Sequence, residues 1–294
     1  MKGFSFRKLK KKLKITVLTL IVAVFAVSFV LPMVFTVANS FMSEPEINSN
    51  YGTVFETDSY SSEKVNLKLI PDKVTGKQYE NVLLKSPDYL MKFWNSVFLA
   101  VPITVFQVLI ALGAAYCFSR FKGKVKSLVF FLYIIIMLMP YQVTLVPNYL
   151  VADKLKLLNT RWSIIFPGVF ATFSVYLLTK YMRRIPEELI DAAKIDGAGH
   201  FKIFTKICIP LCRSAVASVA ILVFIDYWNM VEQPLIMLKD SEYHPLSVFL
   251  SEINKGEIGL AFAAAVVYMI PPILIFLYGE DYLVDGIASY GGNK

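Results

Sequence analysis

Six long stretches of this chain are almost free of charged side chains, and they limit the folds that it can adopt. The stretches are Ile15–Ser43, Phe93–Ser119, Ser127–Ala152, Trp162–Thr179, Ser214–Val231 and Ile258–Gly279. Only Ser214–Val231 contains a charged residue, Asp226. A transmembrane helix needs about 20 mostly apolar residues, and a helix satisfies its own backbone hydrogen bonds in lipid. The sequence therefore predicts an all-α integral membrane protein with six transmembrane helices.

The first apolar stretch is expected to be a permanent membrane anchor. A cleaved signal peptide has an apolar region of about 7–15 residues, and Ile15–Ser43 is longer. The sequence Thr36-Val37-Ala38 is also a poor cleavage site.

The positions of Lys and Arg predict the orientation of the six helices. Residues 1–14 carry seven basic residues and no acidic one, the segment 120–126 carries four and none, and the segment 180–213 carries seven against four. These segments alternate with less basic connections, of which 231–257 has two basic and five acidic residues. Because cytoplasmic loops are enriched in Lys and Arg, both termini are expected in the cytoplasm. The net charge of +8 is thereby explained without nucleic acid.

The segment between the fourth and fifth stretches predicts two short helices joined by a bend on the cytoplasmic surface. Pro186 favours the start of a helix over Glu187–Ile195, whose first turn is acidic and so suits the positive helix end. Asp196-Gly197 is a turn-forming pair, and the apolar spacing of Phe201–Cys208 predicts the second helix. Pro210 is expected to open the next span. A connector that rests on lipid is the alternative, but small residues and a bend suit the docking of a cytoplasmic partner.

This segment resembles the EAA loop of binding-protein-dependent ABC transporter permeases. That loop has Glu-Ala-Ala, then Gly, then Ile-x-Leu-Pro, where this chain has Asp191-Ala192-Ala193, Gly197 and Ile207-Cys208-Ile209-Pro210. Asp for Glu and Ile for Leu are mild departures. Further motifs similar to those of the carbohydrate-uptake (maltose-type) branch are Asn95-Ser96, Ala115-Tyr116, Ser119-Arg120-Phe121, Gly123, Met139-Pro140, Val146-Pro147, Leu158-Asn159-Thr160, Ile195-Asp196-Gly197-Ala198, Trp228-Asn229 and Pro234-Leu235.

The resemblance implies a permease subunit of an ABC importer in a prokaryotic cell membrane. Its implied partners are a second related permease, two cytoplasmic ATPase subunits, and an external solute-binding protein that delivers a sugar or oligosaccharide. The EAA loop would be the coupling helix that fits a cleft of the ATPase. The residues implied in this coupling are Glu188, Asp191, Ala192, Ala193, Asp196, Gly197 and Pro210.

The chain then divides into five parts. These are a basic cytoplasmic N-tail (1–14), the first transmembrane helix (15–43), an external loop (44–92), a permease core with five transmembrane helices and the coupling loop 186–210 (93–279), and a cytoplasmic C-tail (280–294). By the same resemblance the C-tail contacts the ATPase subunits, and a frayed terminus is the alternative.

No catalytic or cofactor-binding pattern is found in the sequence. Neither Gly76-Lys77 nor Gly123-Lys124 is followed by Ser or Thr, as a phosphate-binding P-loop requires. The two His and three Cys residues have no metal-ligand spacing. We therefore expect no enzyme and no cofactor in this chain, with ATP bound by partner subunits. The alternatives are a permease for amino acids or polyamines, a membrane enzyme, which needs acid, base or metal groups, and a structural scaffold.

Polar and aromatic residues in the apolar stretches are candidates for the solute pathway: Asp226, Tyr227, Trp228, Asn229 and Gln142. A carboxylate inside a membrane is costly, so Asp226 either lines a route or bonds Tyr or Asn of another helix. Tyr227 and Trp228 either stack on a sugar ring or belong to an aromatic belt at the membrane boundary. Gln142 either contacts the solute or bonds a neighbouring helix, and the latter use is the commoner one.

Overall fold

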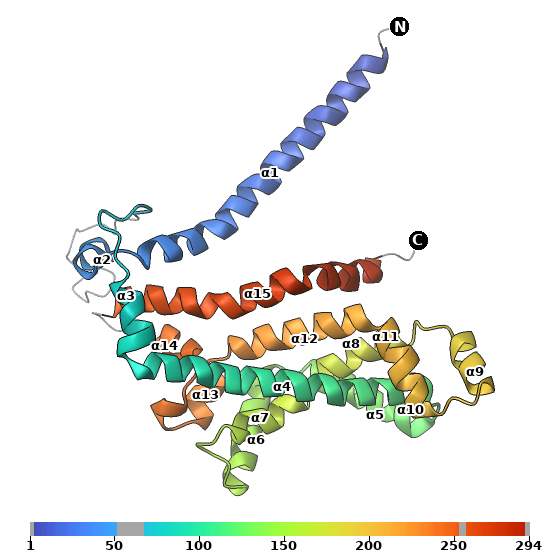
Figure 1. Ribbon diagram of the computed structural model, residues 1–294. Helices are drawn as coiled ribbons and strands as arrows, with labels where there is room; N and C mark the ends of the chain where they lie inside the picture. The colour runs from blue at the N-terminus through green and yellow to red at the C-terminus, as the bar shows by residue number, and fades with distance from the viewer. Residues whose placement is uncertain (1–2, 52–67, 253–256, 292–294) are drawn as a thin grey trace. The chain divides into compact units, whose positions relative to one another are not determined.

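The computed structural model describes residues 3–51, 68–252 and 257–291, and the regular elements in these ranges are all helical (Figure 1). This confirms the predicted all-α class. The chain forms two compact units. Unit 1 comprises Met1–Pro87 and Ile253–Val267, and unit 2 comprises Asp88–Glu252 and Tyr268–Lys294.

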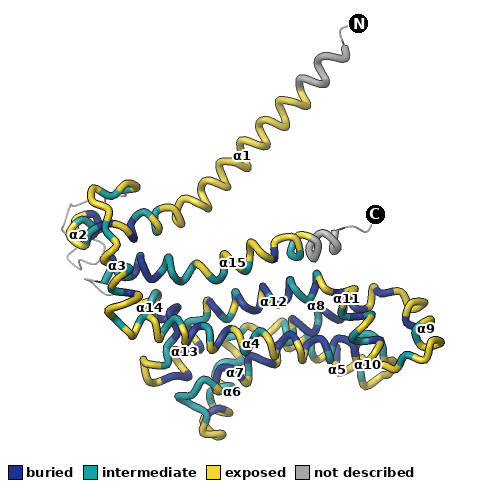
Figure 2. The backbone as a smooth tube through the Cα atoms, in the orientation of Figure 1, coloured by how far each residue is buried: buried dark blue, intermediate teal, exposed yellow. Residues whose placement is uncertain are grey.

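Unit 1 is built around a long, apolar first helix. Its elements are α1 (Gly3–Asn39), α2 (Glu44–Tyr51), α3 (Lys77–Glu80), a π-helical turn (Asn81–Lys85) and the start of α15 (Ile258–Gly291). Asn39, at the end of α1, donates a hydrogen bond from Nδ2 to the hydroxyl of Tyr51 at 2.8 Å. The side chains of residues 10–34 are exposed along α1 (Figure 2). A helix that is apolar on all sides is stable only in lipid or against another protein.

Unit 2 holds the remaining helices. They are α4 (Pro87–Arg120), α5 (Lys124–Met137), α6 (Tyr141–Lys154), α7 (Trp162–Val169), α8 (Thr172–Met182), α9 (Glu187–Ile195), α10 (His200–Ile203), α11 (Ile209–Leu211), α12 (Arg213–Trp228), α13 (Glu232–Met237), α14 (Leu246–Ser251) and the rest of α15. Figure 1 shows α9 and α10 at one end of unit 2 and α13 and α14 at the other. We call residues 187–211 the hook and residues 238–246 the distal loop.

The expected membrane spans are present in the described residues, but two of them are bent. Four apolar helical spans are long enough to cross a membrane: Lys10–Asn39, Pro87–Arg120, Trp162–Met182 and Ile258–Val284. Two further spans are formed only if bent helix pairs are counted, which gives up to six. The last helix also continues to Gly291, into the segment predicted as a C-terminal tail.

The third predicted span is broken into two helices. Helices α5 and α6 meet at an angle of 105° around Leu138–Pro140. The break follows from Pro140, which lacks a backbone N–H and disfavours helical geometry in the residue before it. Each arm has 14 residues, or about 21 Å at 1.5 Å per residue, so neither crosses a hydrocarbon core of about 30 Å alone.

A second bend separates the hook from α12. The arms His200–Leu211 and Arg213–Trp228 meet at 76°. The prediction that Pro210 opens the next span is wrong. Pro210 lies inside the short helix α11, directly after a π-helical turn at Phe204–Cys208. The missing N–H of proline is tolerated in the first turn of a helix, and π-turns often accompany kinks. The span itself begins three residues later, at Arg213.

Candidate functional site: the hook and an interhelical cavity

The first arm of the hook, α9, has the bounds that the sequence predicts. Helix α9 runs from Glu187 to Ile195, with Pro186 before it and two glutamates in its first turn. Gly197 has φ +76°. Its N–H donates to the carbonyl of Lys194 at 3.0 Å, and the N–H of Ala198 donates to that of Ala193 at 2.9 Å. These two bonds form a Schellman motif, which requires a left-handed residue at the position of Gly197.

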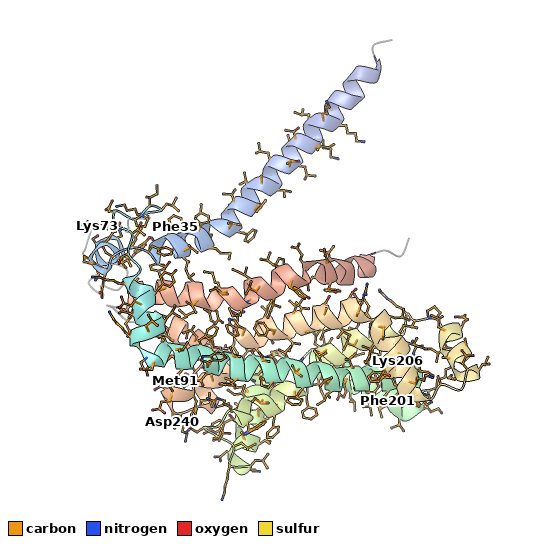
Figure 3. The ribbon with its side chains drawn as sticks, in the orientation of Figure 1. Phe35, Lys73, Met91, Phe201, Lys206 and Asp240 are labelled. Carbon is orange, nitrogen blue, oxygen red and sulfur yellow. The ribbon has the colours of Figure 1, made fainter. Side chains whose placement is uncertain are left out.

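Two large apolar side chains of the hook are exposed on its surface. Ile195 is 87% exposed and Phe201 is 78% exposed, and Figure 3 marks Phe201 and Lys206 on the second arm. Of the predicted coupling residues, Ala193 is half-buried against the core, and the others are exposed: Glu188, Asp191, Ala192, Asp196, Gly197 and Pro210. Asp191 Oδ1 lies 2.9 Å from Lys194 Nζ, a surface pair that contributes little stability.

Buried side chains anchor both arms of the hook. Ile190 of α9, Ile203 of α10 and Cys208 of the π-turn belong to one core cluster with residues of α4, α8 and α12. The hook is therefore packed on the helix bundle while its outer face stays free. An apolar face of this kind on a well-anchored protrusion suits a protein partner.

Arg120, the last residue of α4, braces the approach to the hook. Its guanidinium donates hydrogen bonds to the carbonyl of Met182 at 2.5 Å and to that of Ile185 at 3.3 Å. These carbonyls lie at the C-terminal end of α8, where a cation also favours the negative helix end. In the sequence Arg120 stands out only as part of a motif, because its partners lie more than sixty residues away.

The second arm is held on α4 by aromatic contacts. The hydroxyl of Tyr116 lies 3.0 Å from Nδ1 of His200. The ring of Tyr116 lies 5.1 Å from that of Phe204, and the ring of Phe121 lies 5.0 Å from that of His200. Such ring pairs stabilise by about 0.5–1.5 kcal/mol beyond the burial of area. The motif residues Tyr116 and Phe121 therefore position the hook, a role that the sequence did not reveal.

A cavity of 460 Å³ lies in unit 2 where two helices are interrupted. Its walls are formed by Tyr141, Asp226, Tyr227, Asn229, Met230, Val231, Glu232 and Gln233. Tyr141 follows the break between α5 and α6, and residues 229–231 separate α12 from α13. Irregular backbone at membrane depth is tolerated where it is buried in protein or lines a water-filled cavity, so the two breaks and the cavity form one feature.

Three of the five candidate pathway residues line this cavity, and two do not. Asp226, Tyr227 and Asn229 are in its wall. Trp228 is only 1% exposed, and its Nε1 donates to the carbonyl of Tyr268 at 3.1 Å. It is a core residue, packed with Ala100 and Phe224, and at about 100° per residue it lies about 200° around the helix from Asp226. Gln142 is exposed outside the cavity wall.

Polar groups at the far end of unit 2 hold the distal loop. Asn95 of α4 donates from Nδ2 to the carbonyl of Glu242 at 2.6 Å and accepts at Oδ1 from Arg161 at 2.7 Å. Asn159, with φ +61°, accepts from the N–H groups of Lys239 and Asp240, both at 2.9 Å. Figure 3 marks Asp240 at this end. Asn95, known from the sequence only as part of a motif, thus fixes a loop.

Comparison with known proteins places the chain among transport proteins. Residues 107–288, more than half of the chain, match the family described as "Binding-protein-dependent transport system inner membrane component". The arabinooligosaccharides transport system permease protein AraQ of Halalkalibacterium halodurans is 29% identical over 76% of this chain and 81% of that protein. The osmoprotective compounds uptake permease protein GgtD of Synechocystis is 35% identical over 70% and 72%, respectively.

A further relative and a solved structure agree with this result. The melibiose/raffinose/stachyose import permease protein MelC of Bacillus subtilis is 33% identical over 66% of this chain and 74% of its own. A bacterial ABC transporter involved in the import of the acidic polysaccharide alginate has the same fold. One of its chains superposes with a TM-score of 0.78 at 21% identity, covering 93% of this chain and 97% of that one. The resemblance noted in the sequence is confirmed, and the chain belongs to the family of binding-protein-dependent transport system inner membrane components.

Proposed function

We propose that this chain is the membrane-spanning permease subunit of an ABC importer and translocates a sugar or oligosaccharide. The observation that carries the proposal is the exposed apolar hook, anchored on the bundle, in a chain that belongs to the permease family. Relatives named for arabinooligosaccharides, for lactose, and for melibiose, raffinose and stachyose support a carbohydrate. A second candidate is a smaller osmoprotective solute, because the relative that is 35% identical is named for such compounds.

The proposed division of labour gives this chain no catalytic step and no cofactor. Two cytoplasmic ATPase subunits bind and hydrolyse ATP, and the hook transmits their movement to the spans. An external solute-binding protein delivers the solute, as the complex of the alginate transporter with its periplasmic protein supports by analogy of fold. A second, related permease completes the channel, and the apolar surface of α1 suits contact with it and with lipid.

Capture of the ATPase subunits tests this function. Phe201→Asp places a charge on the exposed face of the second arm, and we expect it to reduce ATPase co-purification at least about tenfold, because desolvating an unpaired charge in an interface is costly. Phe201→Leu keeps the apolar surface and should retain capture. Ser241→Asp, in the distal loop, is the second control. Full ATPase capture by Phe201→Asp would contradict docking at this face.

We propose that the hook and both termini lie in the cytoplasm of a prokaryotic cell and that the distal loop lies outside. The alternation of Lys and Arg supports this orientation. In a Cys117→Ser background, a membrane-impermeant maleimide should label Ser241→Cys in intact cells and Lys202→Cys only after permeabilisation. Cys208 and Cys212 are buried and give little background. Labelling of Lys202→Cys in sealed cells would reverse the orientation.

A further inference from the structure

The two carboxylates are the charged groups of the described cavity wall, and the protein leaves both without a partner there. Neither Asp226 nor Glu232 has a hydrogen bond or an ion pair with another residue of the described ranges. The hydroxyl of Tyr227 donates to the carbonyl of Gly168 at 3.3 Å. Asn229 donates to the carbonyl of Ile225 at 2.8 Å and accepts from the hydroxyl of Tyr268 at 2.9 Å. The hydroxyl of Tyr227 and the amide of Asn229 thus serve the fold, whereas the hydroxyl of Tyr141 in the same wall has no hydrogen-bond partner among the described residues.

Asp226 and Glu232 are exposed, and no hydrogen bond or ion pair within the described ranges explains a carboxylate at these two positions. A charged side chain at membrane depth is unfavourable unless it meets water, a partner or a passing ligand. Asp226 lies within α12, three residues before Asn229, and Glu232 begins α13 on the other side of the same interruption. The described wall of the cavity contains no Lys, Arg or His to balance them. The space between the broken helices is therefore negatively charged.

The charge of the cavity wall bears on which solutes can pass through it. The alginate importer, named for an acidic polysaccharide, has the same fold, so the fold alone leaves the charge of the solute open. A cleft lined by one sign of charge concentrates ions of the opposite sign and excludes those of the same sign. Aromatic rings from Tyr141 and Tyr227 lie in the same wall and suit the apolar faces of a sugar ring.

We infer that Asp226 and Glu232 make this route selective for neutral or amine-bearing oligosaccharides and exclude solutes that carry carboxylates. The inference rests on the proposed function, since it treats the cavity as part of the solute route. The two carboxylates then select solutes by charge, and Asp226 does not serve to hold helices together by a hydrogen bond.

A charge-sensitive labelling experiment tests the inference in the complete importer. Met230→Cys, in the Cys117→Ser background, places a thiol in the cavity wall. Its reaction rates with a cationic trimethylammonium-ethyl methanethiosulfonate and with an anionic sulfonatoethyl methanethiosulfonate are measured and expressed as a ratio. Dividing by the same ratio for free cysteine removes the intrinsic reactivity of the two reagents. The reagents serve as small charged stand-ins for the solute.

We expect the normalised ratio to favour the cation on the order of tenfold. It should fall to within about twofold of unity in Asp226→Asn/Glu232→Gln, whose amides keep the shape of the carboxylates and remove both charges. The matched control is Asp240→Asn/Glu242→Gln, which removes two carboxylates from the distal loop and should leave the ratio unchanged.

Three outcomes overturn the inference: a ratio near unity in the parent, a ratio that the cavity amides do not change, and a thiol that reacts with neither reagent. The last would show that the cavity is closed to solutes. ATPase capture by the hook is measured on the same preparations. If the ATPase subunits still co-purify but the rate ratio gives one of these outcomes, charge selection alone is rejected. If the ATPase subunits do not co-purify with the parent, the proposed function is rejected.

Discussion

Gly197→Val is expected to abolish uptake while the protein reaches the membrane at its normal level. Gly197 has φ +76°, which a β-branched residue adopts only at a cost of roughly 1–3 kcal/mol. A Cβ at this position would meet no atom within 4 Å, so the effect is one of backbone conformation and not of crowding. Relief of the strain breaks the bonds to Lys194 and Ala193 and turns α9 away from its docking position.

A neighbouring glycine provides the control for this prediction. Gly199 has φ −71°, and a Cβ there would also meet no atom within 4 Å. Gly199→Val should therefore keep uptake, and Gly197→Asn should restore part of it, since Asn tolerates left-handed geometry. Uptake, membrane level and ATPase capture are measured for each variant. Equal uptake by the two valine variants would show that the bend does not couple the hook to transport.

Arg120→Ala should cause the second large loss, by releasing the hook from the bundle. Removal of the guanidinium takes a donor from each of the carbonyls of Met182 and Ile185, and the Met182 carbonyl then keeps only the N–H of Ile185 at 3.3 Å. A buried carbonyl left without a donor costs about 1–3 kcal/mol. Arg120→Lys should recover little, because a single ammonium does not reproduce the planar fork that reaches both carbonyls. Thermal unfolding and ATP-driven uptake are the measurements.

The exposed Lys122 is the control for charge in the same segment. Lys122→Ala removes a cation but no hydrogen bond found among the described residues, so its unfolding and uptake should match the parent. If Arg120→Ala unfolded and transported like Lys122→Ala, the bonds to the end of α8 would have no part in holding the hook.

Local sequence signals predicted the first helix and the bend of the hook, but they could not predict its contacts with residues distant in the sequence. Helix α9 and the bend at Gly197 depend on caps, charges and turn residues within a dozen positions, which the sequence displays directly. The bond between Tyr116 and His200 joins residues 84 apart, and nothing in either neighbourhood predicts it. Trp228 was open to several interpretations because its burial depends on Phe224 and Tyr268, the second of which lies on another helix.

The geometry of the third span could also not be predicted from the sequence. Its apolar run predicts a membrane span and Pro140 favours a kink in it, but hydropathy carries no information on direction, so the angle of 105° could not be predicted. A proline within an apolar run is compatible with both a kink and a break. Pro102 and Pro140 illustrate the difference, since α4 continues through the first and α5 stops before the second.

Helix α4 holds the distal loop through Asn95, the hook through Tyr116, and the segment before the hook through Arg120. At 1.5 Å per residue, Tyr116 and Arg120 lie roughly 31 and 37 Å along the helix from Asn95. One continuous helix therefore fixes the rotation of the distal loop relative to the hook about the axis of α4. A single inserted or deleted residue between the attachments would rotate one against the other by about 100°, which no side-chain adjustment absorbs. The number of residues in α4 therefore determines how the two ends are oriented relative to each other. It can change only by insertions or deletions close to whole helical turns of 3.6 residues.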